Sequence, residues 1–128
     1  MTSLFVILLA VVQPLTAWAG AQESPFVCNL GVLTAEDRAR KEEISRSLRG
    51  LIAQVRELPD GFEFQFRPEA ATLPLLGEWT WSERLCCPFF DFDLRLEREG
   101  GPLRLRLTGR EGVKQFINAT PMLCRNWK

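Results

Sequence analysis

The sequence contains no histidine, the commonest general base and the commonest ligand of borderline metal ions in proteins. Catalysis by an imidazole group and metal coordination by an imidazole group are therefore excluded. The chain also has no net charge, because Lys plus Arg and Asp plus Glu number 16 each. Nucleic-acid-binding proteins usually concentrate an excess of basic residues on one face, whereas here Arg and Glu are interspersed. We therefore expect no nucleic-acid partner, and the sequence identifies no protein partner.

Near its start the chain has one long hydrophobic run. Residues 4–12 are all apolar, Pro14 follows, and Ala17 and Ala19 place small residues at positions −3 and −1 of a cleavage site. This order of features is typical of a secretory signal peptide. We expect residues 1–19 to be that signal peptide and the mature protein to be exported, periplasmic or secreted, with no membrane contact after cleavage.

Three alternatives to cleavage after residue 19 stay open at this stage. Ala21 offers a second cut position, and an uncleaved leader would anchor the chain to the membrane, although 18 residues interrupted by polar positions are short for a span. A misassigned start is the third. With cleavage, the expected organisation is a linker over 20–27, a single domain over 28–120 and a C-terminal tail over 121–128.

The hydrophobic periodicity predicts helices and strands in alternation. Thr34 is a candidate N-cap for a helix whose apolar stripe extends through Ile52 and Val55 and ends at the turn 59–61. Residues 62–66 alternate Phe with polar residues and predict a strand.

The second half of the chain continues the pattern. Residues 72–87 predict a helix that Pro88 ends, and two strands over 90–97 and 103–107 predict a hairpin. Thr108 and Glu111 form a capping box for a last helix. The order α-β-α-β-β-α predicts an α+β, two-layer sandwich with a small three-stranded, mainly antiparallel sheet.

Cysteines are the one distinctive chemical feature of the domain. The chain has four: Cys28, Cys86, Cys87 and Cys124. Cys86 and Cys87 are adjacent, so on a helix they point about 100° apart, and both can bind one metal ion only if the helix unwinds, as Pro88 favours. Glu83 precedes the pair by three and four residues and can share a face with either thiol.

The electrostatics of this segment oppose a simple reactive thiol. Reactive cysteines favour helix N-termini and cationic neighbours, whereas Cys86 and Cys87 lie at a predicted helix C-terminus next to Glu83. A bound soft cation would deprotonate the thiols and remove this obstacle. Thiolate-rich sites without histidine suit Cu(I), Zn(II) or another soft metal.

Disulfides are the competing interpretation, because exported domains of this size commonly pair their cysteines. Three connectivities are open. Pairing Cys28 with one residue of the adjacent pair and Cys124 with the other would join both ends of the domain to the second helix. A third alternative is a thiol-dependent enzyme, with Cys86 or Cys87 as nucleophile and Glu83 as acid and base.

Residues 83–90, with the sequence ERLCCPFF, resemble the E-R-x-C-C-P-F block of a group of small uncharacterised bacterial proteins. The stretches 28–34 and 108–114 are similar to the same group, so the resemblance covers roughly residues 28–117. It implies that the four residues of one shared pattern are Cys28, Glu83, Cys86 and Cys87. It brings no established activity, and Cys124 and the leader lie outside it.

We therefore expect a non-enzymatic exported domain with a cysteine cluster. In this interpretation the cluster binds a soft metal ion, Cu(I) or Zn(II), or responds to thiol redox state, and its ligands are Cys28, Cys86, Cys87 and Glu83. The alternative is a disulfide-stapled structural or interaction domain with no chemistry of its own.

Overall fold

The computed structural model describes residues 22–120. The predicted signal peptide, the C-terminal tail and Cys124 lie outside this range. The elements in chain order are η1 (Leu30–Val32), α1 (Ala35–Leu51), β1 (Ile52–Leu58), β2 (Gly61–Phe66), α2 (Thr72–Cys86), β3 (Asp91–Leu96), β4 (Leu103–Thr108) and α3 (Val113–Ala119).

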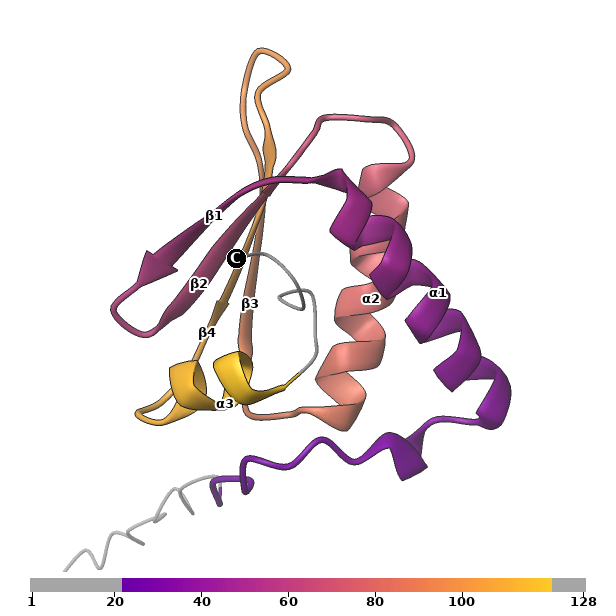
Figure 1. Cartoon of the computed structure of the whole chain (residues 1–128), viewed down its shortest axis with the longest axis vertical. Coiled ribbons are helices and arrows are strands. Elements are labelled where there is room, and N and C mark those ends of the chain that lie inside the picture. The colour runs from indigo at the N-terminus through magenta and orange to yellow at the C-terminus, as the bar shows by residue number, and fades with distance from the viewer. Residues whose placement is uncertain (1–21, 121–128) are drawn as a thin grey trace, which may run out of the picture.

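The molecule has a four-stranded antiparallel sheet with the strand order β1-β2-β4-β3. Helices α1 and α2 lie side by side on one side of this sheet (Figure 1). The predicted α+β class is confirmed. The predicted three-stranded sheet is wrong in detail, because residues 52–58 form an additional edge strand.

This missed strand has a local cause in the spacing of its apolar residues. Ile52 and Val55 are three apart, as on a helix face, and the sequence therefore predicts that the first helix includes them. In the structure α1 ends at Leu51, and an irregularity between Ile52 and Gln54 shifts the pairing register of β1. Ile52 then pairs with Phe66 and Val55 with Phe64, so both lie on the same face of the sheet despite their odd spacing.

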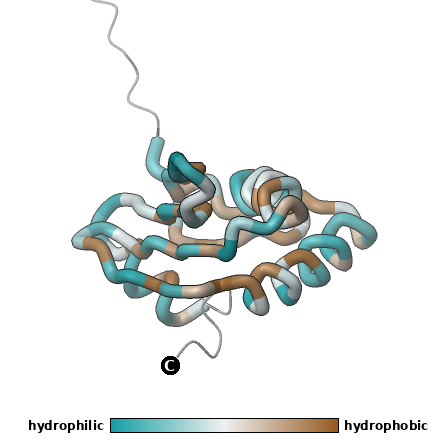
Figure 2. The backbone as a smooth tube through the Cα atoms, turned by 90° about the horizontal axis from the view of Figure 1, so that it is seen from above, coloured by the Kyte–Doolittle hydropathy of each residue, from teal (hydrophilic) through white to brown (hydrophobic). Residues whose placement is uncertain are grey.

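The core lies between the sheet and the helices. Phe62, Phe64 and Phe66 of β2 are buried, as their alternation predicts, and each pairs with a buried leucine of β4. The helices contribute Ile44, Leu48, Leu76, Trp79, Val113 and Ile117 to the same cluster. Hydropathy changes from residue to residue along the backbone (Figure 2), as is expected for elements with one buried face.

A charged residue is also buried on the opposite face of the sheet. Alternation places Glu63 on the solvent side of β2, but its side chain is fully buried because three arginines cover it. Arg104 and Arg106 donate to its carboxylate at 2.8 Å each and Arg56 at 3.1 Å. Gln65 adds a fourth hydrogen bond at 3.2 Å.

Two of the predicted helix boundaries are confirmed. The Thr34 hydroxyl accepts a hydrogen bond from the Asp37 backbone N–H at 3.0 Å and caps α1. The second helix begins at Thr72, as predicted, and ends at Cys86, one residue before its predicted end.

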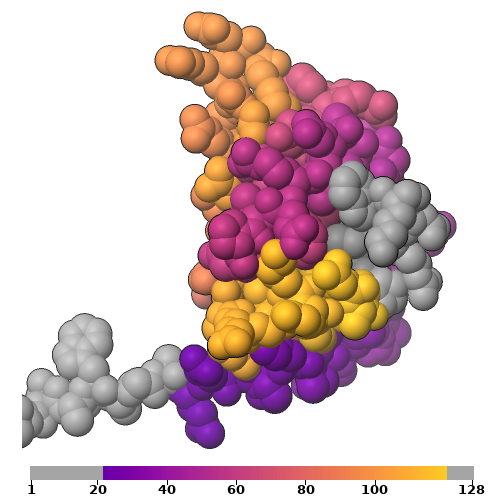
Figure 3. Space-filling model, turned by 60° about the vertical axis from the view of Figure 1, so that its left-hand side comes forward, coloured from indigo at the N-terminus to yellow at the C-terminus, as the bar shows by residue number. Residues whose placement is uncertain are grey.

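The capping box expected at Thr108 is wrong. Thr108 is the last residue of β4, paired with Asp91 and Gly61, and α3 begins only after Gly112. Gly112 has φ 96°, and a Cβ there would lie 2.7 Å from the Phe26 ring. The N-terminal segment lies against α3 (Figure 3), with Phe26 and Phe116 ring centroids 6.1 Å apart.

Within residues 22–120, no helix combines the length and apolarity of a membrane span.

Candidate functional site

A disulfide between Cys28 and Cys87 joins the N-terminal segment to the end of α2, and the two Cα atoms are 4.6 Å apart. A backbone hydrogen bond supports the junction, because the Asn29 N–H donates to the Cys86 carbonyl at 2.8 Å. The helix ends between the adjacent cysteines: Cys86 is its last residue, and Cys87 has the non-helical angles φ −127° and ψ 71°. The unwinding that a shared site requires is therefore present.

The structure brings three of the four residues predicted from sequence within ligand distance of one another, namely Cys28, Glu83 and Cys87, and Cys86 adjoins Cys87; the four together are here called the thiol cluster. The sulfurs of Cys28 and Cys87 and one carboxylate oxygen of Glu83 all lie within 4.8 Å of one another. The Cys86 sulfur lies 3.9 Å from that of Cys87. The cluster therefore contains three sulfur atoms and one carboxylate.

Glu83 is a buried charge with one cationic neighbour. Its side chain is 1% exposed, and Lys41 Nζ on α1 lies 2.6 Å from Oε2. This contact is an ion pair without a well-aligned hydrogen bond, and no other described group donates to Oε2. Burial raises the pKa of Glu83, and the charge of Lys41 opposes that effect. Among the described residues, Lys41 is thus the one cationic group paired with this buried carboxylate.

Cys86 is the free cysteine among the described residues, and it is 1% exposed. Its thiol donates to the Glu83 carbonyl at 3.7 Å. Burial raises the pKa of Cys86, the charge of Glu83 raises it further, and Lys41 partly offsets both. A buried thiol with a raised pKa is a poor nucleophile. The geometry therefore does not favour Cys86 as a catalytic residue, as the sequence electrostatics predict.

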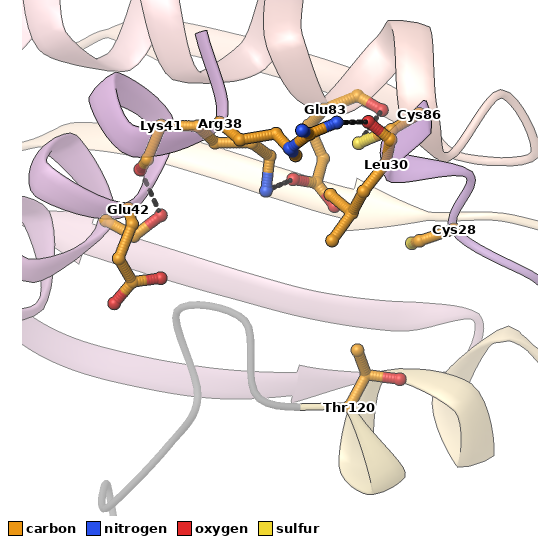
Figure 4. Close-up of a pocket in the computed structure, with 9 residues that line it drawn as sticks. Cys28, Leu30, Arg38, Lys41, Glu42, Glu83, Cys86 and Thr120 are labelled. Atoms are coloured by element: carbon orange, nitrogen blue, oxygen red, sulfur yellow. Dashed lines mark hydrogen bonds and ion pairs between the residues drawn. The ribbon is translucent and has the colours of Figure 1, made fainter. Parts of the chain in front are cut away.

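A cavity of about 270 Å³ adjoins the cluster (Figure 4). The described residues that line it are Cys28, Leu30, Arg38, Lys41, Glu42, Ser45, Glu83, Cys86 and Thr120. Figure 4 shows Cys28 and Cys86 on the same side of it, Lys41 beside Glu83, and Thr120 contributed from the end of α3. Cys87 is fully buried and is not among these lining residues.

Sequence reasoning missed Lys41 and Ser45. The Ser45 hydroxyl donates to the Lys41 carbonyl at 2.8 Å and accepts from Trp79 Nε1 at 3.1 Å, which joins α1 to α2. A signal for both was present, because Lys41 and Ser45 share the helix face of the buried residues Ile44 and Leu48. A lysine on an apolar stripe needs a buried partner, and Glu83 is that partner.

Comparisons of the chain with protein-family models, with curated proteins and with solved structures gave no match. The function has to be inferred from the thiol cluster itself.

Proposed function

We propose that this chain is an exported domain whose thiol cluster is a redox-controlled site for a soft metal ion, with Zn(II) as the ion that suits it best. The observation that carries the proposal is that a buried carboxylate oxygen of Glu83 lies within 4.8 Å of both sulfurs of the disulfide. While Cys28 and Cys87 form a disulfide, neither is available as a thiolate ligand. Reduction releases both beside Glu83.

The donor spacing supports a small tetrahedral ion. With Zn–S bonds of about 2.3 Å and Zn–O bonds of about 2.0–2.2 Å, neighbouring ligand atoms lie roughly 3.5–4 Å apart. The Glu83 oxygen needs to approach the sulfurs by about 1 Å at most from the 4.8 Å limit, whereas the two bonded sulfurs must separate to this spacing after reduction. The Cys86 sulfur lies 3.9 Å from that of Cys87 and is, among the described residues, the nearest further sulfur to the three donors.

The charges favour a divalent ion. The Cys28 and Cys87 thiolates and the Glu83 carboxylate carry three negative charges, and Zn(II) together with the Lys41 ammonium balances them while Cys86 keeps its proton. Cu(I) would leave one negative charge uncompensated in a buried site, which is unfavourable. Cu(I) prefers thiolates to carboxylates, so it would make less use of Glu83. We therefore expect Zn(II) binding to depend on Glu83 and Cu(I) binding to depend on it less.

Export is part of the proposal. Two observations support it: an intramolecular disulfide, which persists in oxidising compartments, and the signal-peptide pattern of residues 1–19. The resemblance to the E-R-x-C-C-P-F proteins is likewise a proposal, and it supports treating Cys28, Glu83, Cys86 and Cys87 as a functional unit.

A competition titration of the reduced protein with a chromophoric Zn(II) chelator tests the site. We expect tight binding by the wild type and, for Glu83→Gln, an affinity lower by more than the roughly 10- to 100-fold typical of lost outer-shell partners. The matched control is Glu78→Gln, which alters an exposed carboxylate of the same helix outside the cluster. Equal affinity of Glu83→Gln and wild type would contradict the proposal.

The second candidate is a domain in which the disulfide only stabilises the fold. It is favoured by the separation of 59 residues between Cys28 and Cys87, since long loops gain most from closure. On the loop-entropy estimate the bond contributes about 4 kcal/mol. If this role is the whole function, Cys28→Ala/Cys87→Ala lowers the melting temperature and reduced wild type binds no Zn(II).

A further inference from the structure

Access to the disulfide is asymmetric. Cys28 is half-buried and lines the cavity, whereas Cys87 is fully buried and does not line it among the described residues. In thiol–disulfide exchange, the rate of attack on a sulfur depends in part on its accessibility. An incoming thiol in the cavity therefore reaches Cys28 Sγ first, and Cys87 becomes the leaving group.

We propose that the cavity admits a small-molecule thiol that opens the disulfide by attack on Cys28 Sγ. This inference deepens the redox part of the proposed function and rests on it. The cavity has a volume of about 270 Å³, which is sufficient for a thiol of a few non-hydrogen atoms.

The lining supports the attacking species. Only the thiolate is nucleophilic, and nearby cations favour it. The cationic side chains of Arg38 and Lys41 line this cavity together with Cys28. The carboxylates Glu42 and Glu83 also line the cavity, and Glu83 is paired with Lys41, so a small thiol that carries further polar groups also finds partners there.

The exchange balances without another oxidant or reductant. The thiolate of the small thiol forms a bond to Cys28 Sγ, and the electron pair of the broken S–S bond moves to Cys87 Sγ. Cys87 then takes up the proton that the small thiol lost. The Cys86 sulfur lies 3.9 Å from that of Cys87, so its S–H can turn from the Glu83 carbonyl to the leaving Cys87 sulfur. A second molecule of the small thiol releases Cys28 and leaves as the symmetrical small-molecule disulfide.

Trapping of the mixed disulfide tests which sulfur is attacked. Oxidised protein of the Cys86→Ser/Cys124→Ser background is treated briefly with 2-mercaptoethanol, quenched with acid, alkylated and mapped by peptide mass. The expected product carries mercaptoethanol on Cys28 and the alkyl group on Cys87. The reverse assignment would overturn the proposal.

Obstruction of the cavity tests the route. Leu30 lines the cavity and is 48% exposed, whereas Val32, on the same short helix and 52% exposed, does not line it. We expect Leu30→Trp to slow reduction by 2-mercaptoethanol at least about tenfold and Val32→Trp to change it less than about twofold. Thr120→Phe obstructs the cavity from α3 and provides a second blocking variant.

The result that would overturn the route is equal slowing by Leu30→Trp and Val32→Trp, or none by either blocking variant. The route would also be overturned if a protein dithiol reduced the disulfide faster than 2-mercaptoethanol and neither blocking variant slowed that reduction. These kinetics use metal-free protein, so their failure is distinguishable from failure to bind Zn(II). If Cys28 is attacked but the reduced protein has no affinity for Zn(II), the exchange proposal stands and the metal-site proposal is refuted.

Discussion

Lys41 Nζ and Glu83 Oε2 lie 2.6 Å apart between α1 and α2, directly beside the thiol cluster. Each side chain occupies a core-facing position of its helix, and only 16% and 1% of their surfaces are exposed. The pair therefore joins the two helices and holds a carboxylate next to the sulfurs of Cys28 and Cys87. This contact therefore contributes both to the stability of the fold and to the proposed metal site.

The first prediction concerns this ion pair. Lys41→Met leaves Glu83 buried without its counter-charge, and removal of one partner of a buried pair costs about 3–5 kcal/mol of unfolding free energy. The double variant Lys41→Met/Glu83→Leu should recover most of that loss in urea unfolding. The matched control is Arg40→Met, which removes a half-exposed pair with Glu78 and should cost far less than Lys41→Met. If the double variant were no more stable than Lys41→Met, the pairing would be refuted.

The second prediction is a pH dependence that originates at Glu63. Burial by itself raises the pKa of this carboxyl, but hydrogen bonds from Arg106, Gln65 and Arg104 and the charge of Arg56 lower it to about 2. Because the pKa is lower in the folded state, the ionised carboxylate stabilises the fold above the ordinary value of 4.5, and this contribution is lost as the pH falls toward 2.

We expect this loss to amount to about 1–2 kcal/mol, after a discount because Arg56 and Arg106 are half exposed to solvent. Urea unfolding at pH 6, 4 and 2.5 should show it in wild type, and a smaller pH slope in Glu63→Gln. The control is Glu97→Gln, which also loses a hydrogen bond to Arg104 but leaves Glu63 in place. Identical pH slopes for Glu63→Gln and wild type would be the contrary result.

The third prediction contrasts two glycines. A Cβ at Gly61 would overlap with the Leu107 carbonyl oxygen and lie 2.8 Å from Thr108 Cα, whereas a Cβ at Gly77 of α2 meets nothing within 4 Å. Gly61→Ala should therefore cost about 1–3 kcal/mol by overpacking. Gly77→Ala should gain about 0.5–1 kcal/mol from helix propensity. Thermal unfolding measures both, and equal effects would show that β2 and β4 are not paired as described.

Much of the fold follows from local patterns in the sequence. The Phe alternation of β2 and the proline after α2 act within a few residues, and both predictions hold. Where long-range contacts decide the structure, local patterns mislead. Ile52 and Val55 have helix-like spacing, but a register shift against β2 places both on one face of the sheet. Thr108 is a plausible helix cap in the sequence, but it is the final residue of β4.

The candidate site shows the same division. Cys86 and Cys87 with Glu83 can be identified from spacing along one helix, but the partner of the disulfide cannot, because Cys28 lies 59 residues from Cys87. Lys41 was visible only as a lysine on an apolar stripe. Its pairing with Glu83 depends on how α1 packs against α2, which no local pattern specifies. The untested pairing of Cys124 stays a prediction of the sequence.

The native mass spectrum of the wild-type protein in the presence of Zn(II), recorded before and after reduction, tests the central claim most directly. Reduction of the Cys28–Cys87 disulfide should convert a protein that retains no zinc into one that retains a single Zn(II) ion. Retention of zinc by both forms, or by neither, would contradict a metal site that the disulfide controls.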